Sequence, residues 1–277
     1  MNEYMKENQK FWDEAVSLHA RSKFYDLETF KKTKNSLLPV ELKEVGEVKG
    51  KSMLHLQCHF GMDTLSWAKR GAKITGIDFS KEAIDFATHL AEELQLEARF
   101  IHSNTYDLPN VLDEKFDIVY MSYGVLCWLD DLKKLGKVIV HFLKPDSIFY
   151  MVENHPFLDM LEEENGKLAI RHSYFKSEPS KYVLDGTYAT SEHPKNNVTY
   201  EWTHTMSEIV NSLVENGMKM EFLHEFPFLE FKFNSLFFQR EDKYWEPIDP
   251  SVKVPLMFSI KAKKSGSLHD RVGSIFK

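Results

Sequence analysis

The stretch MLHLQCHFGMDTLSWAKRGAKITGIDFS, residues 53–80, decides the fold of this 277-residue chain. Two short apolar runs, 52–57 and 73–78, enclose a segment, 63–71, that starts with an acid and ends in lysine, arginine and glycine. That order of charges, closed by a glycine, is typical of a helix. The stretch therefore predicts a strand, a helix and a second strand, the unit from which parallel sheets are built.

The same alternation continues along the chain. Ser80 is a good N-cap, and apolar residues recur at helical spacing from there to Leu94. Another helix is predicted from Leu132 to about Leu143. Further strands are predicted at 98–103, 116–122 and 147–153. The middle strands show almost no polar alternation, which is expected when both faces of a sheet are covered. The predicted fold class is α/β, with a doubly wound, mostly parallel sheet.

The alternation stops after Glu153. Residues 154–204 are polar, aromatic and rich in turns, and we predict a β-rich cap or lid here. A hairpin is expected around Asp185-Gly186, and a strand within NVTYEWTH, residues 197–204.

The remainder of the core follows the cap. Thr205 and Glu208 fit a capping box at the start of a helix, which Gly217 ends. Two closing strands are predicted at 218–226 and 254–263. The expected organisation is an N-terminal helical arm (1–45), a cofactor-binding α/β core (46–153), the cap (154–204), the rest of the core (205–264) and a tail (265–277).

Composition narrows the function classes. A net charge of −7 argues against a general nucleic-acid binder, which needs basic surface. An uninterrupted apolar run of about 18 residues is missing, so we expect no membrane association. Two cysteines are too few for a disulfide framework or a cysteine zinc site, and the polar N-terminus lacks a signal-peptide core. We expect a cytoplasmic protein without a metal, and a homo-oligomer is possible.

Polar and aromatic residues follow each predicted strand, where ligands bind in open parallel sheets. They are Gln57, His59 and Gly61 after the first strand, Asp78 and Phe79 after the second, Asn104 and Thr105 after the third, and Ser122 and Tyr123 after the fourth. Asp78 follows Gly61 by 17 residues, a position from which a carboxylate accepts hydrogen bonds from both ribose hydroxyls. Phe79 can then pack on an adenine face. The alternative for Asp78 is that it caps the following helix.

The stretch 53–87, followed by FDIVYMSYGVLCWLDDL (116–132), resembles the class I S-adenosylmethionine-dependent methyltransferases. It is most similar to a bacterial subgroup whose first motif reads LHLQCHFG, and the resemblance runs from about residue 10 to residue 264. The resemblance implies a seven-stranded sheet with an antiparallel last strand, and S-adenosyl-L-methionine as cofactor. The resemblance implies that Gly61 lets the loop approach the methionine part of the cofactor, that Asp78 binds the ribose and that Phe79 packs on the adenine. It also implies that Asn104 contacts the adenine amine, and that Ser122 and Tyr123 line the site beneath the sulfonium.

The first motif departs from the family pattern, which is acid-x-Gly-x-Gly-x-Gly. His55 replaces the acid, Gln57 and His59 replace two glycines, and Gly61 alone remains. A dinucleotide loop needs those glycines so that backbone N–H groups reach phosphate, but S-adenosylmethionine has no phosphate. Gln57 or His59 can instead hydrogen-bond the ligand. The same departures fit a loop that has lost its ligand.

The leading hypothesis is methyl transfer to a small-molecule acceptor. Candidate catalytic residues are His155, His204 and Tyr123, and candidate substrate walls are Trp12, Tyr25, Trp128 and Trp202. A histidine suits proton removal near neutral pH. The alternatives for these residues are structural histidines and ordinary core aromatics. Two other functions stay open: a non-catalytic S-adenosylmethionine or nucleoside-binding module, and a nicotinamide-dependent oxidoreductase, which the glycine-poor loop disfavours.

Overall fold

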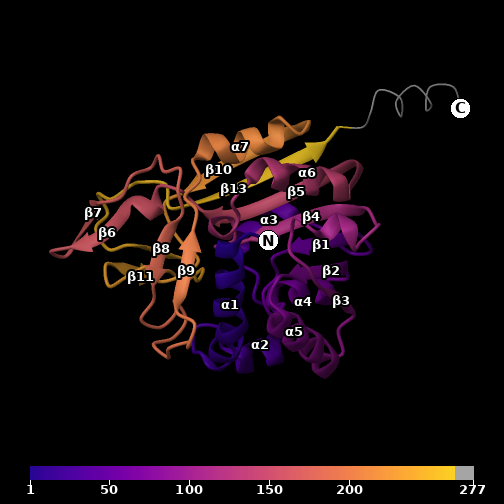
Figure 1. Cartoon of the computed structure of the whole chain (residues 1–277), viewed down its shortest axis with the longest axis horizontal. Coiled ribbons are helices and arrows are strands. Elements are labelled where there is room, and N and C mark those ends of the chain that lie inside the picture. The colour runs from indigo at the N-terminus through magenta and orange to yellow at the C-terminus, as the bar shows by residue number, and fades with distance from the viewer. Residues whose placement is uncertain (266–277) are drawn as a thin grey trace, which may run out of the picture.

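A seven-stranded sheet forms the centre of the molecule in the computed structural model, which describes residues 1–265 (Figure 1). The strands, in spatial order, are β10 (Met218–Phe226), β13 (Met257–Lys264), β5 (Leu143–Asn154), β4 (Phe116–Ser122), β1 (Ser52–Leu56), β2 (Lys73–Asp78) and β3 (Ala98–His102). β13 pairs antiparallel with both neighbours, and the pairs from β5 to β3 are parallel. The predicted fold class and the antiparallel last strand are confirmed.

Helices cover both faces of the sheet. They are α1 (Glu3–Arg21), α2 (Leu27–Thr33), α3 (Pro39–Val45), α4 (Met62–Lys69), α5 (Lys81–Leu94), α6 (Leu132–Phe142) and α7 (Met206–Val214). Leu54 and Leu56 of β1 pack in a cluster with residues of α6 and α7, whereas Met53 packs in another with residues of α3 and α4. Successive side chains of β1 thus enter two separate apolar clusters, which explains its continuous apolar run.

Local signals place several helix ends. The hydroxyl of Ser80 accepts the N–H of Ala83 at the start of α5, and Thr205 with Glu208 forms the predicted capping box of α7. Gly71, just after α4, has a φ of +89°, a conformation in which glycine is free of Cβ strain.

The cap contains small sheets rather than the tight hairpin we predicted. β6 (Leu161–Glu164) pairs with β7 (Lys167–Ile170), and β8 (Ser180–Val183) pairs with β9 (Val198–Glu201). The predicted hairpin around Asp185-Gly186 is wrong, because β8 finds its partner across the whole 184–197 loop. Gly186, with a φ of +102°, makes only a local turn inside this loop. The strand predicted within residues 197–204 is confirmed as β9.

The remaining short elements lie in connections. These are the 3-10 helices η1 (Leu108–Asn110), η2 (Leu126–Trp128) and η3 (Leu158–Met160), and a third two-stranded sheet of β11 (Phe237–Gln239) and β12 (Trp245–Pro247). Within residues 1–265 there is no helix long and apolar enough to cross a membrane.

Helix α1 lies between the cap and the core, as Figure 1 shows for the indigo helix beside β9 and α5. Asn8 holds the cap side: its amide donates to Tyr200 O at 2.7 Å and its Oδ1 accepts Tyr200 N at 2.8 Å. Gln9 holds the core side by donating to the carbonyl of Phe79. The N-terminal helix therefore covers the carboxyl ends of β1 and β2.

Candidate active site

The loop between β1 and α4 keeps a glycine-type backbone although it carries side chains. Gln57, His59 and Gly61 all have positive φ, at +55°, +49° and +83°. Each left-handed non-glycine residue costs roughly 1–2 kcal/mol. The fold imposes this geometry through bonds from Cys58 N to Ile77 O (2.8 Å) and from Gly61 N to Cys58 O (2.9 Å). The side chains of Gln57 and His59 are thus held at the carboxyl ends of the central strands. We call this region, at the ends of β1, β2 and β4 where ligands bind in open parallel sheets, the crevice.

Gly61 is required by packing. A Cβ at this position would lie 2.8 Å from Phe100 Cε1 and 3.0 Å from Ala87 Cβ. The glycine lets β3 and α5 approach the loop closely, a reason that the sequence motif alone did not suggest. Contact of Gly61 with the methionine part of a cofactor stays a prediction.

Asp78 ends β2 inside the crevice. Its Oδ2 accepts the N–H of His59 at 2.8 Å, and its Oδ1 accepts the N–H of Ser80 at 2.9 Å. Burial raises the pKa of Asp78 to about 6, against the lowering effect of these two bonds. Ser80, and not Asp78, caps α5 through its side chain. Each carboxylate oxygen has further lone-pair capacity, so Asp78 can accept ligand hydroxyls.

Three further predicted cofactor residues lie at the ends of β2 and β3. Phe79 carries a carbonyl that accepts both Gln9 and, at 2.9 Å, His102 Nε2. Asn104 turns its Oδ1 to the N–H of Tyr106 at 2.8 Å, and Thr105 is buried beside it. Their contacts with adenine stay predictions.

Gln57 spans the point where the strand order reverses, between β1 and β4. Its Nε2 donates to Val125 O at 3.1 Å, while its buried Oε1 has no partner within residues 1–265. The loop it reaches is fixed from below, because the carboxylate of Glu153 accepts the N–H groups of Gly124, Val125 and Leu126. Hydrogen bonds therefore hold the 124–126 loop at the base of the crevice, and Gln57 Oε1 beside it remains free to accept a hydrogen bond.

The acid that the first motif lacks has a counterpart in the first turn of the next helix. Asp63 of α4 accepts the hydroxyl of Ser122 at 3.0 Å and that of Ser36 at 2.5 Å. His55 touches the same Ser122 hydroxyl at 3.4 Å, and burial lowers its pKa to about 3, so it is neutral. Asp63 escaped the sequence analysis, although its position in the first turn after Gly61 was a usable signal.

Comparison with known proteins identifies this core. Residues 54–151 match the family model described as "Methyltransferase domain". These residues belong to the methyltransferase domain family. The ubiquinone biosynthesis O-methyltransferase of Coxiella burnetii is 29% identical over 123 residues, which cover 43% of this chain and 52% of that protein. The chain thus spans about half the length of the curated relatives it matches.

Solved structures show the same fold. A putative S-adenosylmethionine-dependent methyltransferase from Listeria monocytogenes superposes with a TM-score of 0.57 at 18% identity, over 81% of this chain and 96% of that one. An S-adenosylmethionine-dependent methyltransferase from Mesorhizobium loti superposes with a TM-score of 0.56 at 18% identity, over the same two shares. The class I methyltransferase fold predicted from the sequence is confirmed.

Two histidines predicted as catalytic have structural contacts in this methyltransferase fold. His155 Nδ1 accepts the N–H of Phe157 at 3.0 Å, and its Nε2 lies 3.0 Å from Glu225 Oε1 without hydrogen-bond alignment. His204 donates from Nε2 to Leu129 O at 2.7 Å. Burial lowers the pKa of both imidazoles. A catalytic role for either stays a prediction that these contacts do not favour.

Tyr123 directs its hydroxyl to helix α3. It has a φ of +42°, and its hydroxyl donates to Glu41 Oε2 at 2.7 Å. Burial raises the pKa of Glu41 to about 8, so this carboxyl is protonated at neutral pH. The backbone of Tyr123 lies at the crevice, but its hydroxyl is bonded to Glu41 of α3. A catalytic role for Tyr123 therefore also stays a prediction.

A different histidine pair lies at the mouth of the methyltransferase crevice. His19 of α1 and His59 share a hydrogen bond of 3.1 Å between Nδ1 and Nε2, and His19 Nε2 shares one of 3.0 Å with Thr187 Oγ1 in the cap. Burial lowers the pKa of His19 to about 4. The sequence analysis missed His19; its position seven residues after Trp12, on the same helix face, was the available signal.

Aromatic rings from four parts of the chain surround this pair. We call them the aromatic enclosure: Trp12, His19, Tyr25, His59, Trp128 and Tyr188. Trp12 lies 5.1 Å from His59 and 5.2 Å from Trp128 between ring centroids. Three of the predicted substrate walls thus come together. Trp202 does not join them, since its ring lies 6.2 Å from Tyr4 and packs on the apolar core.

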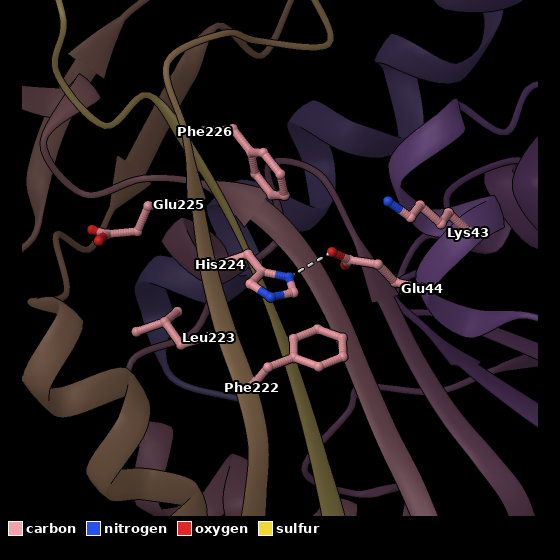
Figure 2. Close-up of a pocket in the computed structure, with 7 residues that line it drawn as sticks. All are labelled: Lys43, Glu44, Phe222, Leu223, His224, Glu225 and Phe226. Atoms are coloured by element: carbon pink, nitrogen blue, oxygen red, sulfur yellow. Dashed lines mark hydrogen bonds and ion pairs between the residues drawn. The ribbon is translucent and has the colours of Figure 1, made fainter.

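A cavity of about 690 Å³ lies elsewhere, at the edge of the sheet. Figure 2 shows Phe222, His224 and Phe226 of β10 on the side facing α3, with His224 bonded to Glu44 at 2.7 Å. β13 and β5 separate this cavity from β4 and the crevice. The described part of the chain holds no group of three or more His, Cys, Asp or Glu arranged for a metal ion.

Proposed function

We propose that the protein transfers a methyl group from S-adenosyl-L-methionine to a small-molecule acceptor. The observation that carries this proposal is Asp78, a buried carboxylate at the end of β2 that is anchored by two backbone N–H groups and still able to accept hydroxyls. The methyltransferase domain family and the shared fold support it. When bound, the cofactor supplies a methyl group carried on positive sulfur.

The residues present fit that cofactor. Asp78 can accept the ribose hydroxyls, and the unpartnered Oε1 of Gln57 can accept a hydrogen bond from the ligand across the crevice. Asp63 and Glu153 add buried carboxyl groups nearby that have no basic partner within residues 1–265. A crevice with this charge suits a cationic ligand. Phe79 and Asn104 are the proposed contacts of adenine.

The chain's own contribution is alignment and exclusion of water. Reacting atoms must be held about 3–3.5 Å apart and in line. Glu153 fixes the 124–126 loop from below, and α1 covers the crevice from above. Trp12 and Trp128 shield the space between this loop and α1 from water. Exclusion of water favours a reaction that removes positive charge from sulfur.

The acceptor is proposed to be a small organic molecule that attacks through a hydroxyl oxygen. The named activity of the curated relatives, O-methylation in ubiquinone biosynthesis, supports oxygen as the attacking atom. The acidic net charge of −7 disfavours nucleic acid as a substrate. A cytoplasmic location and a homo-oligomer are part of the same proposal.

A non-catalytic binding module is the second candidate. It is favoured by the strained backbone of Gln57 and His59, two residues with side chains that stand where the family has glycine. Calorimetry with S-adenosylmethionine and S-adenosylhomocysteine tests occupancy, and transfer of a labelled methyl group to a panel of hydroxyl compounds tests turnover. We expect binding and turnover. Binding without turnover in any panel would favour the module, and binding of NADH alone would refute both.

A further inference from the structure

Two of the enclosure's own rings, those of Tyr25 and Tyr188, are phenols. Tyr188, in the cap loop, packs its ring 4.9 Å from His19 and 6.3 Å from Trp12, and its hydroxyl bonds to the hydroxyl of Tyr25. The ring of Phe24 lies 5.3 Å away on the outer side. Tyr188 is 52% exposed and Phe24 45%, so they form the solvent-facing wall of the enclosure.

The inner wall offers an unused hydrogen-bond donor. Trp12 Nε1 is buried and has no acceptor within residues 1–265, whereas Trp128 Nε1 donates to Gly124 O at 2.8 Å. Trp67 Nε1 is also unpaired, but its ring is fully enclosed in the core. Trp12 differs because its ring lies beside that of the half-exposed Tyr188. An oxygen atom of a ligand would satisfy its N–H.

The charges around the enclosure exclude an anionic ligand. Its two imidazoles are neutral, because burial lowers the pKa of both His19 and His59. The enclosure itself contains no lysine or arginine. The carboxylates of Asp63 and Asp78 face Tyr25 closely enough to raise the pKa of its hydroxyl further, after the larger effect of burial. A carboxylate or phosphate ligand would meet only repulsion here.

We propose that the aromatic enclosure is the acceptor site and that it takes an uncharged hydroxyaromatic molecule, which replaces the ring of Tyr188. The ligand's ring would contact Trp12 and His19 edge to face, as Tyr188 does. Its oxygen would accept the N–H of Trp12, and its hydroxyl would take the partner that Tyr188 now has, the hydroxyl of Tyr25. This assignment rests on the proposed methyl transfer for the identity of the ligand as acceptor.

Because the ligand is proposed to replace the ring of Tyr188, removal of that ring should raise the affinity for the ligand. Catechol is the probe, and calorimetry on the full chain measures its affinity. Tyr188→Ala should bind catechol about tenfold more tightly than the unmodified protein, because the competing ring is gone. Adding Trp12→Phe to that variant should weaken binding about fivefold, since one hydrogen bond is lost. Trp202→Phe, outside the enclosure, is the matched control and should change nothing.

Benzoate tests the charge argument. It should bind at least tenfold more weakly than catechol, because the carboxylates of Asp63 and Asp78 lie near Tyr25. Catechol affinity that is unchanged or reduced in Tyr188→Ala, with an unchanged melting temperature, would overturn the proposal. Preference for benzoate would do the same. S-adenosylhomocysteine is titrated in parallel: its failure to bind refutes the proposed methyl transfer, while the catechol series still decides whether the enclosure binds hydroxyaromatics.

Discussion

His19 and His59 meet through their imidazoles, with 3.1 Å between Nδ1 and Nε2, and join the first helix to the loop after the first strand. Thr187 extends the contact into the cap. Three segments far apart in the sequence are therefore closed over the crevice by neutral imidazoles. A charge on either ring would place a cation in a buried site, and burial therefore lowers the pKa of both imidazoles.

The histidine contact predicts a loss of stability in acid. The pKa of His19 falls from 6.5 to about 4 on folding, because burial disfavours its charged form. The unfolded chain then binds the proton first, so the folded state loses stability as pH falls from about 6.5 to about 4. We expect the free energy of unfolding to drop by about 2–3 kcal/mol more in the wild type than in His19→Gln over this range.

Urea denaturation at pH 7 and pH 4.5 measures that difference. Asp78 acts in the opposite direction, since a raised carboxyl pKa favours the folded state on protonation, but it is common to both proteins. His89→Gln, on the exposed side of α5, serves as the control. Equal pH dependence of wild type and His19→Gln would contradict the prediction.

Asp78→Ala should weaken binding of S-adenosylhomocysteine by about 1.5–3 kcal/mol, the range for hydrogen bonds to a charged group. Calorimetry measures the affinity at pH 7.5, above the pKa of about 6. Asp78→Asn is the companion variant, because it keeps the size of the side chain while removing its charge. Full affinity in Asp78→Ala would show that the ribose assignment is mistaken.

Gly61→Ala should destabilise the fold more than Gly217→Ala. Both glycines have similar φ, +83° and +81°, so both variants suffer the left-handed strain of roughly 1 kcal/mol or more. Only at Gly61 does the new methyl group meet neighbours, Phe100 and Ala87, whereas Gly217 has open space around it. We expect an additional cost of about 1–3 kcal/mol for Gly61→Ala. Identical melting temperatures would refute the packing argument.

Glu153→Gln should cost about 2–3 kcal/mol of stability, because an amide NH₂ would then face backbone N–H groups that now bond to a carboxylate. Since Glu153 fixes the floor of the crevice, turnover should fall more than cofactor affinity. Glu163→Gln, on the exposed face of β6, is the matched control. A stable Glu153→Gln protein with normal turnover would remove Glu153 from the positioning role.

The sequence predicted those elements whose signals are local. Strand β2 and the caps at Ser80 and Thr205 follow from short patterns of polarity and hydrogen-bonding side chains, and the structure confirms them. The hairpin at Asp185-Gly186 failed because the partner of β8 is chosen by tertiary packing, with β9 held against α1 through Asn8.

The candidate site was predicted unevenly for the same reason. Asp78 could be placed because it directly ends a strand. His19 could not, since its role depends on where α1 docks on the loop at His59. His155 and His204 also follow predicted strands or the cap, yet the partners that engage them, Glu225 and Leu129, come from segments that no local pattern connects to them.

The exchange of His55 and Asp63 has a consequence for tracing distant relatives. Both side chains reach the hydroxyl of Ser122, but only Asp63 brings a carboxyl group there, and it does so from the helix instead of the strand. A profile that demands an acid inside the first strand would pass over proteins built this way. A spatial template that accepts a carboxyl group arriving from either the strand or the following helix would recover them.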